Sequence, residues 1–126
     1  MSKSEVREHA AGYLNPDNDD RLAVIRRLND NLRMNGLGGT TVFTAGVQAL
    51  PEPILQSVLR AFTQDADFCE SNDPRGEHDF GVIEIGEHRL FWKIDYFDES
   101  FRFHSSDPSD SSKTERVLTL MLDFEY

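Results

Sequence analysis

The sequence predicts an α+β fold, in which an antiparallel meander of three to four strands packs against about three helices. Two observations lead to this prediction. Apolar and polar residues alternate with period two over residues 80–105, which is typical of half-buried strands. Apolar residues recur at helical spacing over residues 22–32 and 54–62, which is typical of helices that bury one face.

A tight hairpin at Gly86-Glu87 sets the register of the first two predicted strands. A glycine in the first position of a two-residue loop is typical of such turns. The predicted core face of the second strand consists of Leu90, Trp92, Ile94 and Tyr96. The predicted register pairs Ile85 with His88, Glu84 with Arg89, Ile83 with Leu90, and Gly81 with Trp92.

The second turn of the meander is predicted at Asp98-Glu99. It would return the chain as a third strand that ends near Ser105. Opposite charges and apolar side chains would then face each other across the two strands. The pairs that follow are Asp95 with Arg102, Lys93 with His104, and Ile94 with Phe103.

The segments before the meander predict two helices and one strand. Residues 17–20 are rich in Asp and Gly36 follows the first apolar stripe, so we expect a helix between them. Residues 40–44 are rich in β-branched side chains and predict a short strand. Pro51 and Pro53 suit the first turn of a second helix, which ends near residue 63.

Residues 108–124 leave two alternatives open. Asp107 and Pro108 suit the start of a helix, which favours a final helix through TERVLTLMLDF. The apolar run Val-Leu-Thr-Leu-Met-Leu also fits a buried strand. The helix is the preferred interpretation.

Length and composition indicate one domain. We expect a single domain over residues 1–126, in which residues 1–17 pack loosely. Cys69 is the only cysteine, so neither an internal disulfide nor a cysteine-based zinc cluster can form. The sequence contains no signal peptide and no long apolar run, and it predicts a cytoplasmic protein with no membrane partner.

The net charge of −10 lies entirely in the second half of the chain. Residues 1–63 hold seven basic and seven acidic side chains, whereas residues 64–126 hold six basic and sixteen acidic ones. Proteins that bind a phosphate backbone present basic surfaces, so direct binding to nucleic acid is disfavoured. A basic partner is favoured instead.

The predicted topology brings two acidic segments to one end of the sheet. The first strand runs away from the loop before Phe80, and the second strand returns toward it, so this loop and the turn at Asp98-Glu99 would share an end. Within the loop, residues 73–76 (Asp-Pro-Arg-Gly) predict a tight turn. We call the shared surface the acidic pole and expect it to bind the partner. Its members are Asp65, Asp67, Glu70, Asp73, Glu77, Asp79, Asp98 and Glu99.

A second interpretation of the same loop is catalytic. Glu77, His78 and Asp79 supply carboxylates that suit a hard divalent cation and a histidine that suits a general base, as in a metal-dependent nuclease or hydrolase. The chain has no HExxH spacing. A third interpretation is that these residues only build the turn and start the strand. We favour a protein without catalytic residues, metal or cofactor.

Four blocks of the sequence, NDPRGEHDFG, WKIDYFD, SDPSD and RVLTLMLDFEY, occur in this order. Together they resemble the signature of a domain-of-unknown-function family of small bacterial proteins, often carried on plasmids and other mobile elements. The resemblance spans roughly residues 20–126 and brings no established activity. It implies an analogy of size, charge and setting with anti-CRISPR and antirestriction proteins, several of which present carboxylates in place of DNA phosphates.

The leading hypothesis is therefore an acidic, non-enzymatic inhibitor that acts as a DNA mimic. It would bind a basic surface of a nucleic-acid-handling complex, such as a CRISPR effector, at its DNA-binding groove. Carboxylates two residues apart on a strand lie about 6 to 7 Å apart, a spacing that a phosphate-binding groove can accept. The alternative explanation of the same charge is a solvated surface that maintains solubility.

Overall fold

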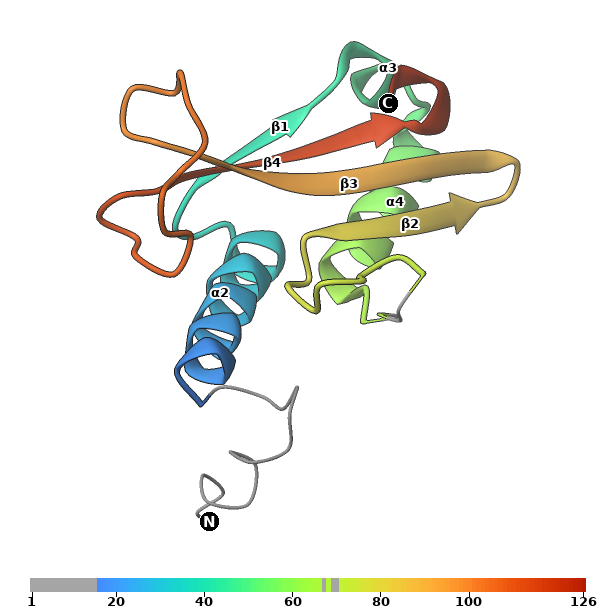
Figure 1. Ribbon diagram of the computed structural model, residues 1–126. Coiled ribbons are helices and arrows are strands. Elements are labelled where there is room, and N and C mark those ends of the chain that lie inside the picture. The colour runs from blue at the N-terminus through green and yellow to red at the C-terminus, as the bar shows by residue number, and fades with distance from the viewer. Residues whose placement is uncertain (1–15, 67, 69–70) are drawn as a thin grey trace.

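A computed structural model describes residues 16–66, 68 and 71–126, and over these residues the chain folds as a four-stranded sheet with three helices (Figure 1). This arrangement confirms the α+β class. The expected loose packing of the N-terminal segment concerns mainly residues 1–15, which lie outside the described residues. The elements are α2 (Pro16–Asn35), β1 (Thr40–Phe43), α3 (Ala45–Gln48), α4 (Glu52–Gln64), β2 (Phe80–Ile85), β3 (His88–Phe97), β4 (Glu115–Leu122) and the 3-10 helix η1 (Asp123–Glu125).

The sheet is mixed, with the strand order β1-β4-β3-β2. The pairs β2–β3 and β3–β4 are antiparallel, whereas β1 runs parallel to β4. The sheet is therefore mostly antiparallel, as predicted, but the expected antiparallel arrangement is wrong for β1. The chain between β1 and β4 contains α3, α4 and the β2–β3 hairpin, and a parallel pair requires a long connection of this kind.

The β2–β3 hairpin has the predicted register at every one of the four pairs. Gly86 has a φ of 61°, which its place in the tight turn requires. Gly81 lies opposite Trp92, where a Cβ atom would come within 2.2 Å of the indole Nε1. The glycine therefore lets the tryptophan ring cover the backbone of β2.

The prediction that residues up to Ser105 form the third strand of the meander is wrong. After β3 the chain makes a single bridge between Phe97 and His104 and then leaves the sheet. The neighbour of β3 is β4, whose Leu118 and Leu120 are fully buried, whereas Phe101 and Phe103 of the predicted third strand are exposed. The predicted pairs replaced by β4 are Asp95 with Arg102, Lys93 with His104, and Ile94 with Phe103.

The preferred helix over residues 108–124 is also wrong, and the strand alternative is confirmed by β4. Asp107 does not begin a helix, because its carbonyl accepts a hydrogen bond from the backbone N–H of Asp110 in a turn. Leu118 and Leu120 are fully buried on alternate positions of β4. Burial on one face of a central strand thus outweighed the capping signal.

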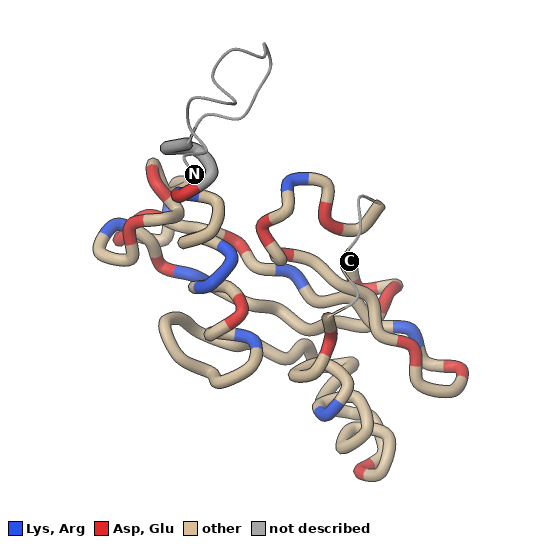
Figure 2. Tube along the Cα trace, turned by 90° about the horizontal axis from the view of Figure 1, so that it is seen from below, with Lys and Arg blue, Asp and Glu red and all other residues tan. Residues whose placement is uncertain are grey.

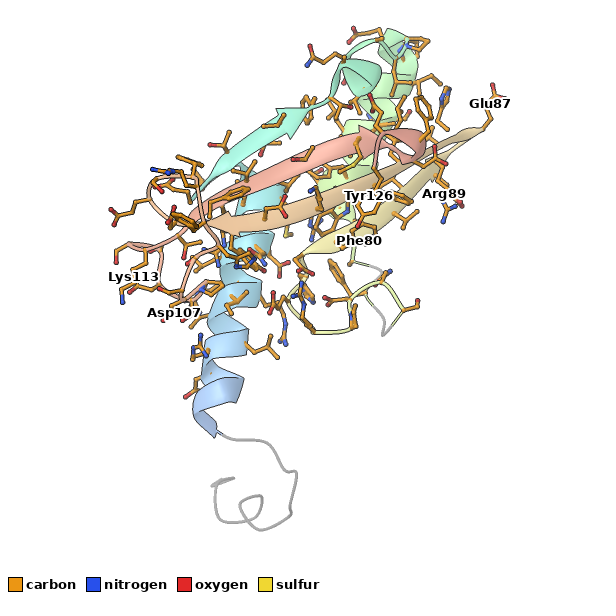
Figure 3. The ribbon with its side chains drawn as sticks, turned by 45° about the horizontal axis from the view of Figure 1, so that its top comes forward. Phe80, Glu87, Arg89, Asp107, Lys113 and Tyr126 are labelled. Atoms are coloured by element: carbon orange, nitrogen blue, oxygen red, sulfur yellow. The ribbon has the colours of Figure 1, made fainter. Side chains whose placement is uncertain are left out.

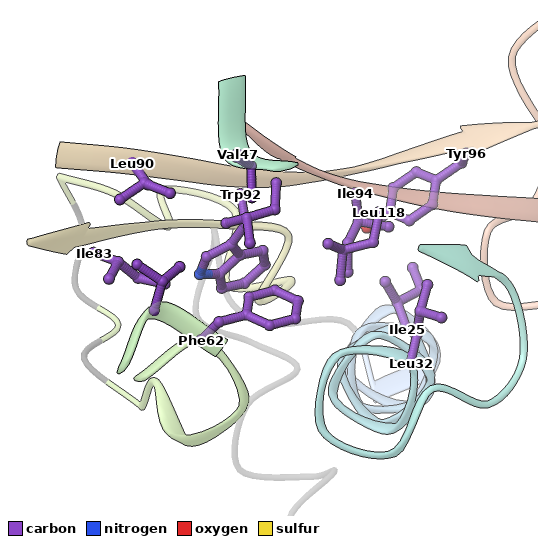
Figure 4. Close-up of a cluster of buried hydrophobic side chains, with 12 residues drawn as sticks. Ile25, Leu32, Val47, Phe62, Ile83, Leu90, Trp92, Ile94, Tyr96 and Leu118 are labelled. Atoms are coloured by element: carbon purple, nitrogen blue, oxygen red, sulfur yellow. The ribbon is translucent and has the colours of Figure 1, made fainter. Parts of the chain in front are cut away.

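The core lies between the sheet and the helices α2 and α4, which cover one of its faces (Figure 1). Figure 4 shows Trp92 beside Phe62 of α4, and the two ring centroids are 6.3 Å apart in an edge-on arrangement. The four side chains of the predicted core face on β3 are all buried, which confirms that prediction. In the described part of the chain, none of the helices is both long and apolar enough to cross a membrane.

Candidate functional site

Asp79 and Asp98, two members of the predicted acidic pole, lie at different positions along β3. Asp79 precedes β2, and its carbonyl accepts a hydrogen bond from the backbone N–H of Ile94 at 2.9 Å. Asp98 follows the end of β3, four residues beyond Ile94. At about 3.3 Å per residue this is roughly 13 Å of strand. The members Asp67 and Glu70 lie outside the described residues.

The loop before β2 is built around Asp73. The predicted turn is present, because the N–H of Gly76 donates to the carbonyl of Asp73 at 3.0 Å. The buried carboxylate of Asp73 also accepts a hydrogen bond from the backbone N–H of His78 at 3.0 Å. His78 has a φ of 58°, a left-handed conformation that costs energy for a residue with a Cβ atom. The carboxylate of Asp73 therefore stabilises the bend that aims the following side chains.

The residues Glu77, His78 and Asp79 contact three different partners. The hydroxyl of Tyr96 donates to Glu77 Oε1 at 2.8 Å, and His78 Nδ1 lies 2.9 Å from Asp30 Oδ1. Asp79 forms an ion pair of 2.6 Å with Arg75. Among the described residues no group of three or more His, Cys, Asp or Glu side chains could hold a metal ion.

The side chain of Asp79 is buried. Burial raises the pKa of its carboxyl group, and the nearby carboxylates Glu77 and Asp73 add to this effect. The ion pair with Arg75 acts in the opposite direction and does not fully compensate, because the arginine side chain is 68% exposed. Asp79 therefore anchors the start of β2, because its carbonyl also bonds to Ile94 of β3.

A second set of contacts surrounds the ring of His78. This ring stacks on Phe68 with a centroid distance of 3.8 Å. Arg33 of α2 is buried behind them, where its guanidinium lies 5.0 Å from the centroid of Trp92 and donates to the carbonyl of Phe62 at 2.9 Å. Asp65, another member of the predicted pole, accepts a hydrogen bond of 3.0 Å from Trp92 Nε1. These polar groups therefore stabilise the contact between the helices and the sheet.

A buried polar network connects the loop before β2 with helix α2, strand β4 and the loop at Pro108. Asn29 Nδ2 donates to the hydroxyl of Tyr96 at 2.7 Å, and Arg116 Nε donates to Asn29 Oδ1 at 2.8 Å. Arg116 also donates to the carbonyl of Pro108 through Nη2. Burial, supplemented by the carboxylate of Glu77, raises the pKa of Tyr96, so its hydroxyl remains a proton donor.

Sequence reasoning missed this network. The signal was present in α2, where Asn29 is four residues after Ile25 and three before Leu32 and therefore lies on the apolar stripe. A polar residue in such a position requires a buried partner. The identity of the partner, Arg116 in β4, depends on the correct assignment of β4 as a strand.

The end of the sheet beyond β3 carries two loops that lie against each other. We call residues 98–115 the loop end. Ser105 Oγ lies 2.7 Å from Thr114 Oγ1 and donates to the carbonyl of Lys113, which joins the two loops. Asp107 and Lys113 lie at the opposite end of the sheet from Glu87 of the hairpin (Figure 3). The acidic residues of the loop end are Asp98, Glu99, Asp107, Asp110 and Glu115, and its basic residues are Arg102 and Lys113.

Three of these acidic residues share one local structure, in which Ser follows Asp two positions later. In each case the backbone N–H and the hydroxyl of the serine donate to the same carboxylate oxygen. The hydroxyl bonds measure 2.7, 2.6 and 2.6 Å. The serine side chain is the main cause that lowers the pKa of each carboxyl group, to about 2 for Asp107. The three pairs are Asp98 with Ser100, Asp107 with Ser109, and Asp110 with Ser112.

Charge is distributed over the whole molecule, with acidic and basic positions interspersed along the chain (Figure 2). The carboxylates of the loop end and those of the loop before β2 differ in the groups to which they bond. Those of Asp73, Glu77 and Asp79 bond to groups of the fold, whereas Asp98 and Asp110 bond only to their own turns among the contacts described.

The fold and these contacts define a small α+β domain with a buried polar network and a loop end rich in ionised carboxylates. A family model described as "Protein of unknown function (DUF3768)" matches residues 43–125, and the chain belongs to this family. The match confirms the expected membership in a domain-of-unknown-function family. No curated protein and no solved structure matches the chain.

Proposed function

We propose that the chain is a non-enzymatic acidic inhibitor that binds the basic DNA-binding groove of a bacterial nucleic-acid-handling complex, of the kind targeted by anti-CRISPR and antirestriction proteins. The binding surface in this proposal is the loop end. The observation that carries it is the set of three Asp-Ser turns, which hold their carboxylates in fixed positions. The carboxylate of Asp107 is also paired with Arg21 at 2.9 Å, whereas those of Asp98 and Asp110 bond only to their own turns among the contacts described. Fixed charges lose less conformational entropy on binding than flexible ones.

This surface differs from the acidic pole in its membership. Asp98 and Glu99 are retained, and Asp107, Asp110 and Glu115 join them. The carboxylates of the loop before β2 are assigned a structural role instead, because they bond to Trp92, Tyr96 and Arg75, among others.

The charge balance supports a basic partner. The loop end carries five acidic residues and two basic ones, within a chain of net charge −10. Such a surface increases the rate of encounter with a positively charged groove, and this effect weakens as salt screens it. The resemblance to small acidic proteins of mobile elements supports a defence complex as the target, by analogy of size, charge and setting.

The proposal is tested by competition with DNA. Purified CRISPR effectors loaded with guide RNA, and purified restriction enzymes, are incubated with labelled DNA and increasing amounts of the protein at low and high salt. We expect at least one complex to lose its DNA, with weaker inhibition at high salt. The proposal fails if every complex of the panel keeps its DNA.

The matched variants separate charge from loop shape. In Asp98→Asn/Asp107→Asn/Asp110→Asn the amide oxygen can still accept the serine hydrogen bonds, but the charge is removed. The control changes the same number of charges at exposed sites elsewhere, as Glu52→Gln/Glu84→Gln/Glu87→Gln. We expect the first variant to lose inhibition and the control to keep it. Equal inhibition by both variants would exclude the loop end as the binding surface.

A further inference from the structure

We propose that the loop end binds an extended peptide segment of a partner protein, one that carries Lys or Arg beside apolar side chains, and that Phe101 and Phe103 are its aromatic contacts. Phe101 is 53% exposed and Phe103 is 65% exposed, on a turn of the chain that protrudes from the sheet (Figure 1). This inference rests on the proposed function, because it uses the same end of the molecule.

The turn that carries the two rings is held in one shape. Asp98 donates its N–H to the carbonyl of Phe103 at 2.8 Å, and Phe101 donates its N–H to the carbonyl of Asp98 at 3.0 Å. The carboxylate of Asp98 accepts further hydrogen bonds from the backbone N–H groups of Ser100 and Arg102. The rings are thus presented from an ordered turn, so little ordering is needed when a ligand binds.

The fold does not account for the exposure of these rings. The nearest ring contact described for Phe101 is Phe97, at a centroid distance of 6.2 Å. Phe101 has a φ of 61°, a conformation that glycine would adopt at lower cost. Two large apolar side chains exposed two residues apart on one turn are typical of a recognition surface.

The chemistry of the ligand follows from the groups around the rings. A shallow hollow of about 370 Å³ lies in the same loop end, lined by Asp98, Glu99, Ser100, His104, Ser106 and Lys113 and not by the two rings themselves. Its two carboxylates suit a lysine or arginine side chain. The guanidinium of Arg102 lies 5.7 Å from the centroid of Phe103, a distance typical of a cation–π contact within the turn. A membrane with anionic headgroups would be repelled by the same carboxylates.

The test uses a phage-displayed library of random peptides, selected on the full chain and depleted on Phe101→Gly/Phe103→Ser. Glycine suits the positive φ at position 101, so this variant is expected to fold, and its thermal unfolding is measured to confirm it. We expect enriched peptides that combine Lys or Arg with apolar residues. They should bind the double variant at least about 30-fold more weakly than the unchanged protein.

The control variant is Phe124→Ser, which removes an 81% exposed ring from η1 instead. Binding of the selected peptides to this control should stay within about twofold. The inference is overturned if no peptide is enriched, if the peptides lack basic residues, or if the double variant binds them as well as the unchanged protein. It is also overturned if phosphatidylcholine vesicles bind the unchanged protein and not the double variant, because a membrane would then be the ligand.

The two proposals can fail separately. The DNA competition with the Asp→Asn variant reports on inhibition, and the peptide selection reports on the aromatic contacts. Peptide binding without displacement of DNA would overturn the proposed function and keep the inference. If the protein displaces DNA but selects no peptide, the proposed function is kept and the inference is overturned.

Discussion

Arg116 of β4 and Asn29 of α2 form a buried hydrogen bond of 2.8 Å between Nε and Oδ1, and this bond connects the sheet to the long helix. Asn29 also bonds to Tyr96, and Arg116 to the carbonyl of Pro108 in the loop end. Asn29 therefore couples the helix to the sheet, and Arg116 extends this coupling to the loop end.

We expect Asn29→Leu to lower the free energy of unfolding by about 2 to 4 kcal/mol, because the buried guanidinium of Arg116 loses an acceptor. Urea unfolding at neutral pH measures the change. The matched control is Asn35→Ala, which removes an exposed asparagine from the same helix and should change the value by less than about 0.5 kcal/mol. Equal stability of the two variants would show that the network contributes little.

We expect Gly81→Ala to destabilise the protein by about 1 to 3 kcal/mol, because the added Cβ atom would lie 2.2 Å from Trp92 Nε1. The tryptophan ring must then move, and its hydrogen bond to Asp65 is strained. The fluorescence of this single tryptophan should change together with the unfolding midpoint. Glu84→Ala on the same strand is the control, since Glu84 is exposed, and it should leave both signals unchanged.

We expect Asp79→Asn to leave stability at pH 7 unchanged or slightly higher. The pKa of Asp79 is raised in the folded protein by burial first, so at pH 7 the ionised form costs stability relative to the neutral form. Arg75→Gln should do the opposite, because it leaves the buried carboxylate without its ion pair. Chemical unfolding of both variants at pH 7 tests this pair of outcomes. A large loss of stability in Asp79→Asn would contradict the predicted direction.

We expect part of the stability to be lost as the pH falls from about 4 toward 2. The folded-state pKa values of Asp98, Asp107 and Asp110 lie below their ordinary value of 3.8, and that of Asp107 is about 2. The unfolded chain therefore binds protons first as the pH falls, which favours unfolding. The stabilisation is present above the unfolded-state pKa and disappears below the folded-state pKa.

The Asp98→Asn/Asp107→Asn/Asp110→Asn variant is the control for this pH dependence. Its amides do not titrate, so its unfolding free energy should fall less steeply over the same pH interval than that of the unchanged protein. The contribution of Asp79 has the opposite sign and is the same in both proteins. Parallel pH profiles of the two proteins would contradict the role of the Asp-Ser turns.

The sequence was informative about the candidate site only where the site is local. The turn at Asp73 and the start of β2 after Asp79 follow from adjacent residues, and both are present. The partners of the loop carboxylates, Trp92, Tyr96 and Arg75, determine whether those carboxylates are available to a ligand. Two of these three partners lie on β3, so their distances depend on the packing of the loop under the sheet.

The sequence by itself determined the α+β class, the helices α2 and α4, and the complete register of the β2–β3 hairpin. These features depend on short-range periodicity and on one two-residue turn, which any chain with the same local pattern would share. Only the tertiary structure decided that β4 pairs with β3 and that β1 pairs in parallel with β4. The physical reason is that several segments could pair with β3 at this buried position. The segment that does so, β4, is the one expected to bury most apolar surface when the whole chain is packed.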